Sequence, residues 1–325
     1  MMQKKVPLID ISSLHDAQAD HQAVVDALRQ ACREYGFFYL KGHAVPETLQ
    51  ARLEDESKRF FALPQAEKMK IRMALGGKAW RGYFPVGDEL TSGRPDLKEG
   101  LYLGTELGPE HPKVKAAIPM HGVNLFPEGM PEFRETILAY ITAMTELGHL
   151  LMKGISLSLG LQADHFSHHY TMDPLTLFRI FHYPAANNPS EKSQWGVGEH
   201  TDYGLLTILK QDETGGLQIK SQDNWLEAPF IPNTFVCNIG DMLERLTKGI
   251  YVSTPHRVRN RASSGRLSYP FFFDPSFDAM MKPLPIVRKA KTEAASRWDG
   301  ANVHDFDGTY GEYLLEKVAK VFPEL

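Results

Sequence analysis

The spacing of hydrophobic and polar positions changes along this chain and predicts where helices give way to strands. Residues 17–35 carry apolar side chains three or four positions apart and stop at Gly36, which predicts an amphipathic helix. A short strand is expected over 37–43. A second helix is expected over 46–64, because it opens with proline and keeps its apolar residues in helical register. The first third of the chain should therefore mix helices and strands.

The middle of the chain divides into an irregular segment and one long helix. Residues 62–130 are rich in glycine and proline, which predicts loops with a few short strands. Apolar side chains then recur every three or four residues from Phe133 to Ile155, and the pattern ends at Gly160. At a rise of ~1.5 Å per residue, a helix over 131–160 is long enough to brace a whole sheet.

From Pro174 onward the pattern becomes one of short β-like runs separated by turn residues. The runs are LTLFRIFHYP, LLTILKQ, GGLQIKS, NWLEAPF, TFVCNIGD, GIYVSTPHRV and RLSYPFFFD. Short strands at close spacing, without long helices between them, favour an antiparallel sandwich or barrel. We therefore expect an α+β, mainly β protein with a single domain over 1–325. Its expected parts are a mixed α/β and loop region over 1–130, the bracing helix over 131–160, a β core over 174–275 and a C-terminal helical cover over 276–325.

Composition limits the class of protein and its location. Of the 325 residues 42% are hydrophobic, enough for a large core, yet the apolar stretches are too short to cross a bilayer. The N-terminus lacks the apolar region of a secretory signal, and Cys32 and Cys237 are expected to be buried thiols. A net charge of -4 with mixed signs offers no basic surface for nucleic acid, and RKAK at 288–291 should be solvated surface. These features predict a cytoplasmic globular protein without nucleic-acid or membrane partners.

Candidate metal ligands stand at the head of an apolar run, in the segment EHTDYGLLTILKQ at 199–211. On a strand, His200 and Asp202 would project from one face. An H-x-D pair alone is common by chance, but His256 in VSTPHRV supplies a third ligand. Two imidazoles and one carboxylate on one face of an octahedral ion leave three positions open, as in non-haem iron(II) oxygenases. The sequence therefore predicts a metal site with room for substrate chemistry.

An anion anchor is expected next to this site. Arg266 and Ser268, in the segment RLS, would lie on one face of the following strand. A guanidinium with a hydroxyl beside it suits a carboxylate, because it donates charge-assisted and bidentate hydrogen bonds. The predicted site thus combines a metal with a carboxylate-binding group.

These segments resemble those of the iron(II)/2-oxoglutarate-dependent oxygenases of the isopenicillin N synthase-like family, whose pattern is H-x-D, a distal H and then R-x-S. The resemblance covers most of the chain, since VPLIDIS, YGFFYLKGH, RGYFP, DLKEGLY, FRIFHYP and VCNIGDMLERLTKG also look like that family's segments in that family's order. It implies a double-stranded β-helix (jelly-roll) core that carries the metal at one open end, with supporting N-terminal, central and C-terminal helices.

The resemblance also implies roles for individual residues. The implied ligands of Fe(II) are His200, Asp202 and His256, and the implied anchors of 2-oxoglutarate are Arg266, Ser268 and Tyr183. Phe181 departs from the family pattern, because many plant relatives have asparagine there. The implied reaction couples decarboxylation of 2-oxoglutarate, to succinate and CO2, to hydroxylation or desaturation of a small molecule by O2, with ascorbate in support.

Three further residues are candidates for the substrate side of the pocket. Arg179 lies four positions from Tyr183 and would share its strand face, while Tyr83 and Phe84 in RGYFP could wall the pocket or pack beside it. Three alternative functions stay open: an oxidase of isopenicillin N synthase type that needs no 2-oxoglutarate, fragmentation of 2-oxoglutarate to ethylene, and a non-catalytic dicarboxylate-binding jelly roll. The sequence leaves the identity of the substrate and the oligomeric state open.

Overall fold

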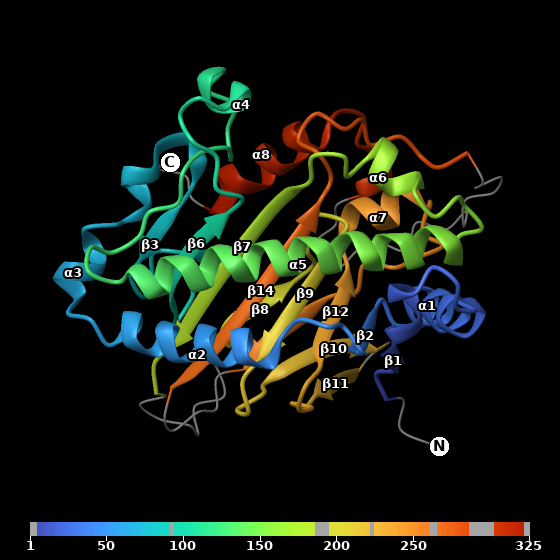
Figure 1. The fold of residues 1–325 in the computed structure, drawn as a ribbon, viewed down its shortest axis with the longest axis horizontal. Coiled ribbons are helices and arrows are strands. Elements are labelled where there is room, and N and C mark those ends of the chain that lie inside the picture. The colour runs from blue at the N-terminus through green and yellow to red at the C-terminus, as the bar shows by residue number, and fades with distance from the viewer. Residues whose placement is uncertain are drawn as a thin grey trace.

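Two β-sheets form the centre of the molecule, and helices cover the outer face of the larger one (Figure 1). The computed structural model describes residues 5–91, 94–185, 195–221, 224–259, 265–285 and 302–321. The larger sheet has the strand order β1-β2-β12-β9-β14-β7-β6-β3, and the smaller has the order β11-β10-β13-β8. β1 pairs with β2 in parallel, and the other neighbours in these two sheets are antiparallel. The predicted jelly-roll class is confirmed.

The strands of the larger sheet are β1 (Leu8–Asp10), β2 (Phe37–Lys41), β3 (Gly82–Phe84), β6 (Glu99–Gly104), β7 (Leu175–Tyr183), β9 (Leu206–Gln211), β12 (Phe235–Ile239) and β14 (Arg266–Asp274). Those of the smaller sheet are β8 (Trp195–His200), β10 (Leu217–Ser221), β11 (Asn224–Ala228) and β13 (His256–Arg259). A separate pair consists of β4 (Leu90–Thr91) and β5 (Arg94–Pro95). The strands from β7 to β14 lie within the segment 174–275, for which the sequence predicted a β core.

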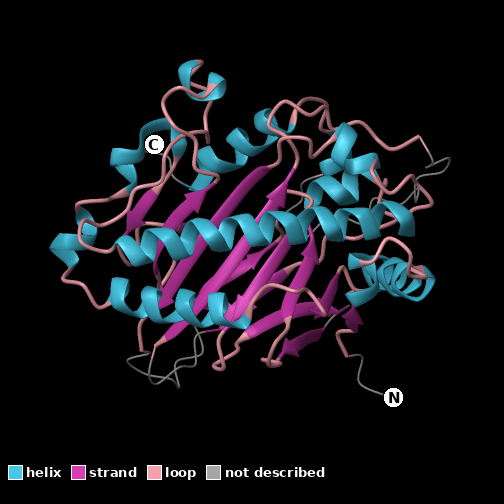
Figure 2. Cartoon of the chain, in the orientation of Figure 1, coloured by secondary structure: helices cyan, strands magenta, loops and turns pink. Residues whose placement is uncertain are grey.

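The α-helices are α1 (Gln22–Glu34), α2 (Glu47–Phe61), α3 (Gln65–Met69), α4 (Pro112–Lys115), α5 (Pro131–Ser158), α6 (His165–His169), α7 (Asp241–Leu246) and α8 (Tyr310–Val321). Stretches of 3-10 helix lie at Ser12–His15, Met73–Ala79 and Val303–Asp305. α5 crosses the strands of the larger sheet, and α2 lies beside α5. α8 lies where β14 ends (Figures 1 and 2). The predicted bracing helix is therefore present as α5.

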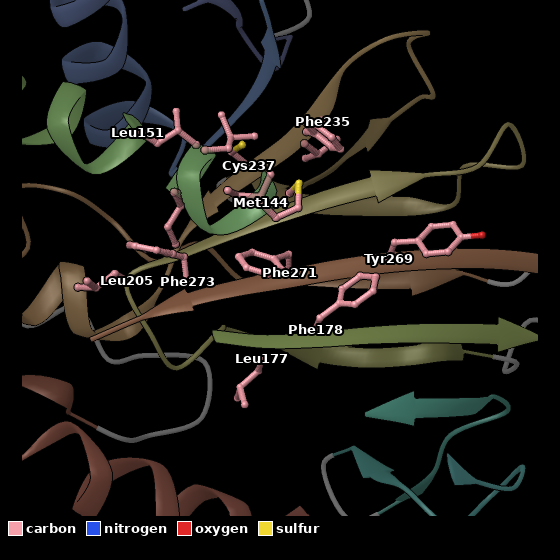
Figure 3. Close-up of a cluster of buried hydrophobic side chains, with 14 of the residues drawn as sticks. Met144, Leu151, Leu177, Phe178, Leu205, Phe235, Cys237, Tyr269, Phe271 and Phe273 are labelled. Carbon is pink, nitrogen blue, oxygen red and sulfur yellow. The ribbon is translucent and has the colours of Figure 1, made fainter. Parts of the chain in front are cut away.

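The main core fills the space between α5 and the larger sheet. Successive residues of β7 leave the strand on opposite sides, so that Phe178 points toward the helix and Leu177 points away (Figure 3). Phe271 and Phe273 of β14 are fully buried on the helix side, together with Met144 of α5. The larger sheet therefore has one face packed under the helices, and its other face carries Leu177 together with polar side chains such as Arg179.

The structure differs from the sequence expectation in the run GIYVSTPHRV, of which only the end forms a strand. β13 begins at His256, and the preceding residues bond outside any ladder: the N–H of Val252 donates to the carbonyl of Cys32, and the N–H of Ser253 donates to Glu244. Pro255 has no N–H to offer. The segment 62–130 contains the expected short strands, such as β6, but also two short helices that were not expected, α3 and α4.

Three further expectations concern the cysteines, the basic segment RKAK and membrane-spanning helices. Cys32 and Cys237 are buried and unpaired, as predicted. The RKAK segment at 288–291 lies outside the described residues. Among the described helices, none combines the length and apolar character that crossing a bilayer requires.

α5 and β14 approach each other closely at Gly148, and this contact can be tested by its effect on stability. A Cβ at this position would lie 2.3 Å from Cδ2 of Phe273, whose ring is fully buried. Gly to Ala in a helix normally stabilises by about 1 kcal/mol, but here overpacking should reverse the sign and cost about 1 to 3 kcal/mol. Urea unfolding of Gly148→Ala measures this, with Glu146→Ala at an exposed position of the same helix as the control. A gain in stability for Gly148→Ala would contradict the packing described here.

Candidate metal centre

The smaller sheet brings two histidines together. β13 pairs antiparallel with β8, and the register places His256 opposite His200. Residues directly opposite each other on paired strands point to the same side of the sheet, and the two imidazole centroids are 4.2 Å apart. Two residues far apart in the sequence thus form one contact.

Asp202 reaches the same point from outside a strand. β8 ends at His200, and Asp202 lies in the connection before β9, so the expectation that the two residues share a strand face is wrong. Oδ1 of Asp202 nevertheless lies 3.8 Å from Nε2 of His200 and 3.8 Å from Nε2 of His256. The N–H of Asp241 donates to the backbone carbonyl of Asp202 at 2.7 Å. Hydrogen bonds, in place of strand alternation, position this carboxylate.

The second carboxylate oxygen of Asp202 is held by the larger sheet. Its Oδ2 accepts hydrogen bonds from Oγ1 of Thr207 at 2.6 Å and from Nδ2 of Asn238 at 2.7 Å. Thr207 on β9 and Asn238 on β12 are cross-strand partners. With Oδ2 occupied in this way, Oδ1 is the oxygen that faces the two imidazoles. Sequence reasoning missed both residues, although each is a polar residue within an apolar strand.

Both histidines present the ring nitrogen that a metal needs. Nδ1 of His200 lies 2.8 Å from the carbonyl of Gly198, and Nδ1 of His256 lies 3.3 Å from the carbonyl of Thr254. A carbonyl only accepts, so Nδ1 donates in each case and the neutral ring keeps its lone pair on Nε2. Such bonds fix both tautomer and ring orientation in metal sites.

The electrostatics favour an ionised carboxylate and a neutral imidazole. Burial raises the pKa of Asp202, but His256 and His200, with the hydrogen bonds from Thr207 and Asn238, outweigh burial and leave that pKa below its usual value. Burial, reinforced by His200, lowers the pKa of His256 to about 4. Deprotonated ligands are the form that binds metal ions.

The ligand atoms of these three side chains converge. Within the described part of the chain, His200, Asp202 and His256 are the group of His, Cys, Asp or Glu side chains found with metal-binding geometry, their ligand atoms all within 4.8 Å of one another. Two imidazoles and one carboxylate that leave other positions free form the ligand set of non-haem Fe(II) sites. The donor set therefore fits Fe(II).

Arg266 supplies a buried cation on the inner face of the larger sheet. Its residue exposure is 1%, and Nε, Nη1 and Nη2 have no hydrogen-bond partner among the described residues. The nearest carboxylate oxygen, Oδ1 of Asp212, lies 3.9 Å away, too far for a hydrogen bond. Tyr183 lies opposite on β7 with its ring centroid 4.8 Å from the guanidinium carbon, and Ser268 is on the same face two positions on. A buried guanidinium with open donors fits an incoming carboxylate.

The three candidates for the substrate side of the pocket do not all lie on the same face of the larger sheet. Arg179 shares the inner face with Tyr183, as expected from β7 alternation, and Phe84 packs there with its ring centroid 6.3 Å from that of Phe181. Tyr83 points the other way, because neighbouring residues of β3 alternate, and its hydroxyl donates to Glu99 on the helix-covered face at 2.6 Å. Arg179 and Phe84 remain on the side of the metal ligands, whereas Tyr83 is separated from them by the sheet.

Comparison with known proteins gives the family. Residues 174–275 match the family model described as 2OG-Fe(II) oxygenase superfamily, and residues 6–129 match the model described as the N-terminal region of a non-haem dioxygenase in morphine synthesis. A Dictyostelium discoideum protein named "Probable iron/ascorbate oxidoreductase" is 50% identical, over 99% of this chain and 96% of its own length. The chain belongs to the 2OG-Fe(II) oxygenase superfamily.

Two further similarities show how closely this oxygenase follows its superfamily. A 1-aminocyclopropane-1-carboxylate oxidase of Dictyostelium discoideum is 40% identical, over 99% of this chain and 96% of its own length. A full-length Neurospora crassa protein, whose crystal structure was solved in complex with alpha-KG and thymine, has a TM-score of 0.80 and 26% identity, covering 97% of this chain and 96% of that one. The protein is therefore an Fe(II)- and 2-oxoglutarate-dependent dioxygenase that acts on a small molecule.

The hydrogen bond from Thr207 to Asp202 can be tested without removing a ligand. Thr207→Val keeps the side-chain shape but removes the donor, and loss of such supporting bonds typically weakens metal affinity about 10- to 100-fold. Thr207→Ser, which keeps the hydroxyl, should bind metal nearly as tightly as the wild-type protein. Competition titrations with Co(II) and a chromogenic chelator give the two affinities. Equal metal affinity in Thr207→Val and Thr207→Ser would show that this bond does not position the carboxylate.

Proposed function

We propose that His200, Asp202 and His256 hold the iron of this oxygenase and that Arg266, Ser268 and Tyr183 bind the distal carboxylate of 2-oxoglutarate. The observation that carries the proposal is the guanidinium of Arg266. It is buried on the inner face of the larger sheet, and no described residue accepts a hydrogen bond from it. A dicarboxylate chelated at the metal would supply that missing acceptor.

The residues around the site divide the work of the reaction. Bound Fe(II) with 2-oxoglutarate supplies the activation of O2 that oxidises the substrate. Thr207 and Asn238 keep Oδ2 of Asp202 occupied, so that Oδ1 stays available as a ligand. Tyr183 covers one side of the Arg266 guanidinium and keeps water from it. The protein's part is therefore to orient the reactants and to exclude solvent.

The proposal extends to the whole chain and its setting. We propose that residues 1–325 act as one unit, since Tyr310 and Tyr313 of α8 donate to Asp274 and Asp241, two residues that adjoin the connection carrying Asp202. A cytoplasmic location is proposed from the two unpaired, buried cysteines. Ascorbate is proposed as a supporting reductant that keeps the iron in its ferrous state. Substrate oxidation is proposed to proceed by hydroxylation or desaturation.

The iron assignment is tested by release of succinate from 2-oxoglutarate with Fe(II), ascorbate and O2. Asp202→Ala should reduce succinate to background, because it removes a ligand and leaves the Thr207 and Asn238 donors without an acceptor. Asp173→Ala, at a side chain that is 60% exposed, serves as the control. Succinate release by Asp202→Ala at the wild-type rate would refute the assignment. Oxygen uptake without 2-oxoglutarate would instead favour the oxidase, and ethylene in the headspace the fragmentation reaction.

The co-substrate anchor is tested at Arg266. Arg266→Met should weaken 2-oxoglutarate binding by about 2 to 5 kcal/mol, because the distal carboxylate would be buried without a counter-charge. Arg266→Lys should give an intermediate affinity, since a lysine keeps the charge but lacks the bidentate donor geometry. Anaerobic calorimetry of 2-oxoglutarate with the Fe(II) protein measures all three affinities. An unchanged affinity in Arg266→Met would place the co-substrate elsewhere.

A further inference from the structure

A second guanidinium, that of Arg179, lies on the same inner face as Arg266 and contacts two aromatic rings. Arg179 faces Tyr102 of β6 in the sheet register. Its guanidinium carbon lies 3.9 Å from the ring centroid of Tyr102 and 4.9 Å from that of Phe272 on β14. Both rings lie within cation–π range of the guanidinium and favour its charged side chain at this position, while its N–H groups can still donate hydrogen bonds.

Few of the donors of Arg179 are used. Nη1 donates to the hydroxyl of Tyr102 at 2.9 Å, while Nε is buried and has no hydrogen-bond partner among the described residues. The side chain is 18% exposed, so the guanidinium is mostly removed from water. A buried guanidinium offers five N–H donors, and leaving them without acceptors is costly. The side chain is therefore prepared to receive an acceptor with more than one oxygen.

The acidic groups nearby are already committed to other partners. Oε1 of Glu89 lies 3.9 Å from Nη1 of Arg179, beyond hydrogen-bond range, and accepts from the hydroxyl of Tyr102 instead. Oε2 of Glu89 pairs with Nζ of the buried Lys98 at 2.9 Å, and Lys98 also pairs with Asp96. Lys98 thus forms ion pairs with both carboxylates, and Arg179 has no carboxylate within hydrogen-bond range among the described residues.

A neighbouring arginine adds positive charge on the same side. Arg81 is 1% exposed, and its Nη1 and Nη2 donate to the backbone carbonyls of Leu103 and Met120 at 2.9 and 3.0 Å. Burial and the charge of Arg179 lower the pKa of Arg81 to about 10. Two buried cations that repel each other make this part of the site favourable for an anion.

The position of Arg179 separates it from the co-substrate anchor. Arg266 stands opposite Tyr183 in the register, four residues along β7 from Arg179. Four strand residues span about 13 Å. Arg179 and Arg266 therefore project from positions well separated along the strands. We treat them as two carboxylate sites and not as one shared site.

We propose that Arg179 binds a carboxylate of the primary substrate, so that the enzyme acts on small carboxylic acids. The inference rests on the proposed function, since it takes the metal-facing side of the sheet as the oxygenase pocket. Tyr102 and Phe272 flank the cation and would pack against the apolar part of the same acid. Arg179 would bind the substrate, while Arg266 would bind only 2-oxoglutarate.

The experiment titrates anaerobic protein carrying Fe(II) and 2-oxoglutarate with a panel of probes by calorimetry. The probes are free amino acids, 2-hydroxy acids and aromatic carboxylic acids, each paired with its own carboxamide. We expect at least one acid to bind, and its carboxamide to bind about 30-fold more weakly or worse, because the amide lacks the charge that pairs with a buried guanidinium. Binding of no acid, or equal binding of acid and carboxamide, would overturn the proposal.

Variants assign the effect to Arg179. Arg179→Met should weaken binding of that acid about 30-fold or more while 2-oxoglutarate affinity changes less than about threefold, and Arg179→Lys should recover part of the loss. Arg52→Met, at an exposed position of α2, should change neither affinity. The proposal fails if Arg179→Met keeps wild-type affinity for the acid, or if it weakens acid and 2-oxoglutarate equally together with a lower melting temperature, since that pattern marks a structural role.

The failure of this inference can be told apart from the failure of the proposed function. If the wild-type protein binds no Fe(II) or 2-oxoglutarate, the proposed function is refuted. The same acids are then titrated into metal-free wild-type and Arg179→Met protein, in which Tyr102 and Phe272 still flank position 179. A loss of acid binding that is specific to Arg179→Met supports the carboxylate site, and its absence rejects it.

Discussion

The carboxylate of Asp202 is the point at which the two sheets are joined, and the rest of the site depends on it. One oxygen accepts from Thr207 and Asn238 on the larger sheet, and the other faces His200 and His256 on the smaller sheet. Neither sheet alone could place the three ligand atoms together. Because each oxygen is committed to one sheet, the carboxylate links the two sheets at the site and sets the direction in which it would hold a metal ion.

Burial of charge distinguishes the two faces of the larger sheet. On the helix-covered face, Glu99 accepts from Lys68 at 2.7 Å and from Tyr83 at 2.6 Å, and it contacts His182 at 2.7 Å. On the inner face, Arg266 and Arg179 keep nitrogens without partners among the described residues. A buried polar group that folding leaves unsatisfied is costly. These two open cations therefore mark the inner face as the side that receives ligands, because a bound carboxylate would supply there the kind of acceptor that Lys68 finds in Glu99 on the other face.

The sequence predicted those parts of the site that follow from periodicity or from order along the chain. Alternation along β7 placed Arg179 with Tyr183, and the order of the H-x-D, distal H and R-x-S segments marked Arg266 and the three candidate metal ligands, whose ligand atoms the structure brings together. It failed where position depends on contacts between distant segments. The connection that carries Asp202 is held by hydrogen bonds from Asn238 and Asp241, which no local spacing links to it. The sequence also could not show which face of the sheet each residue of β3 occupies. A strand of three residues is too short for an alternating pattern to identify its two faces.

The C-terminal helix α8 contributes to the site in addition to β8 and β13, the strands that carry His200 and His256. Tyr313 of α8 donates to Asp241 at 2.9 Å, and Asp241 in turn holds the backbone carbonyl of Asp202. Tyr310 donates to Asp274 at the end of β14, and a Cβ on Gly204 would lie only 1.5 Å from Oδ1 of that aspartate. The loop after Asp202 is thus bonded to the backbone of Asp241 and packed against the carboxylate of Asp274, and the side chains of both aspartates accept hydrogen bonds from α8. A helix about 100 residues further along the chain consequently takes part in positioning Asp202, the candidate metal ligand, which ties the stability of α8 to the geometry of the centre.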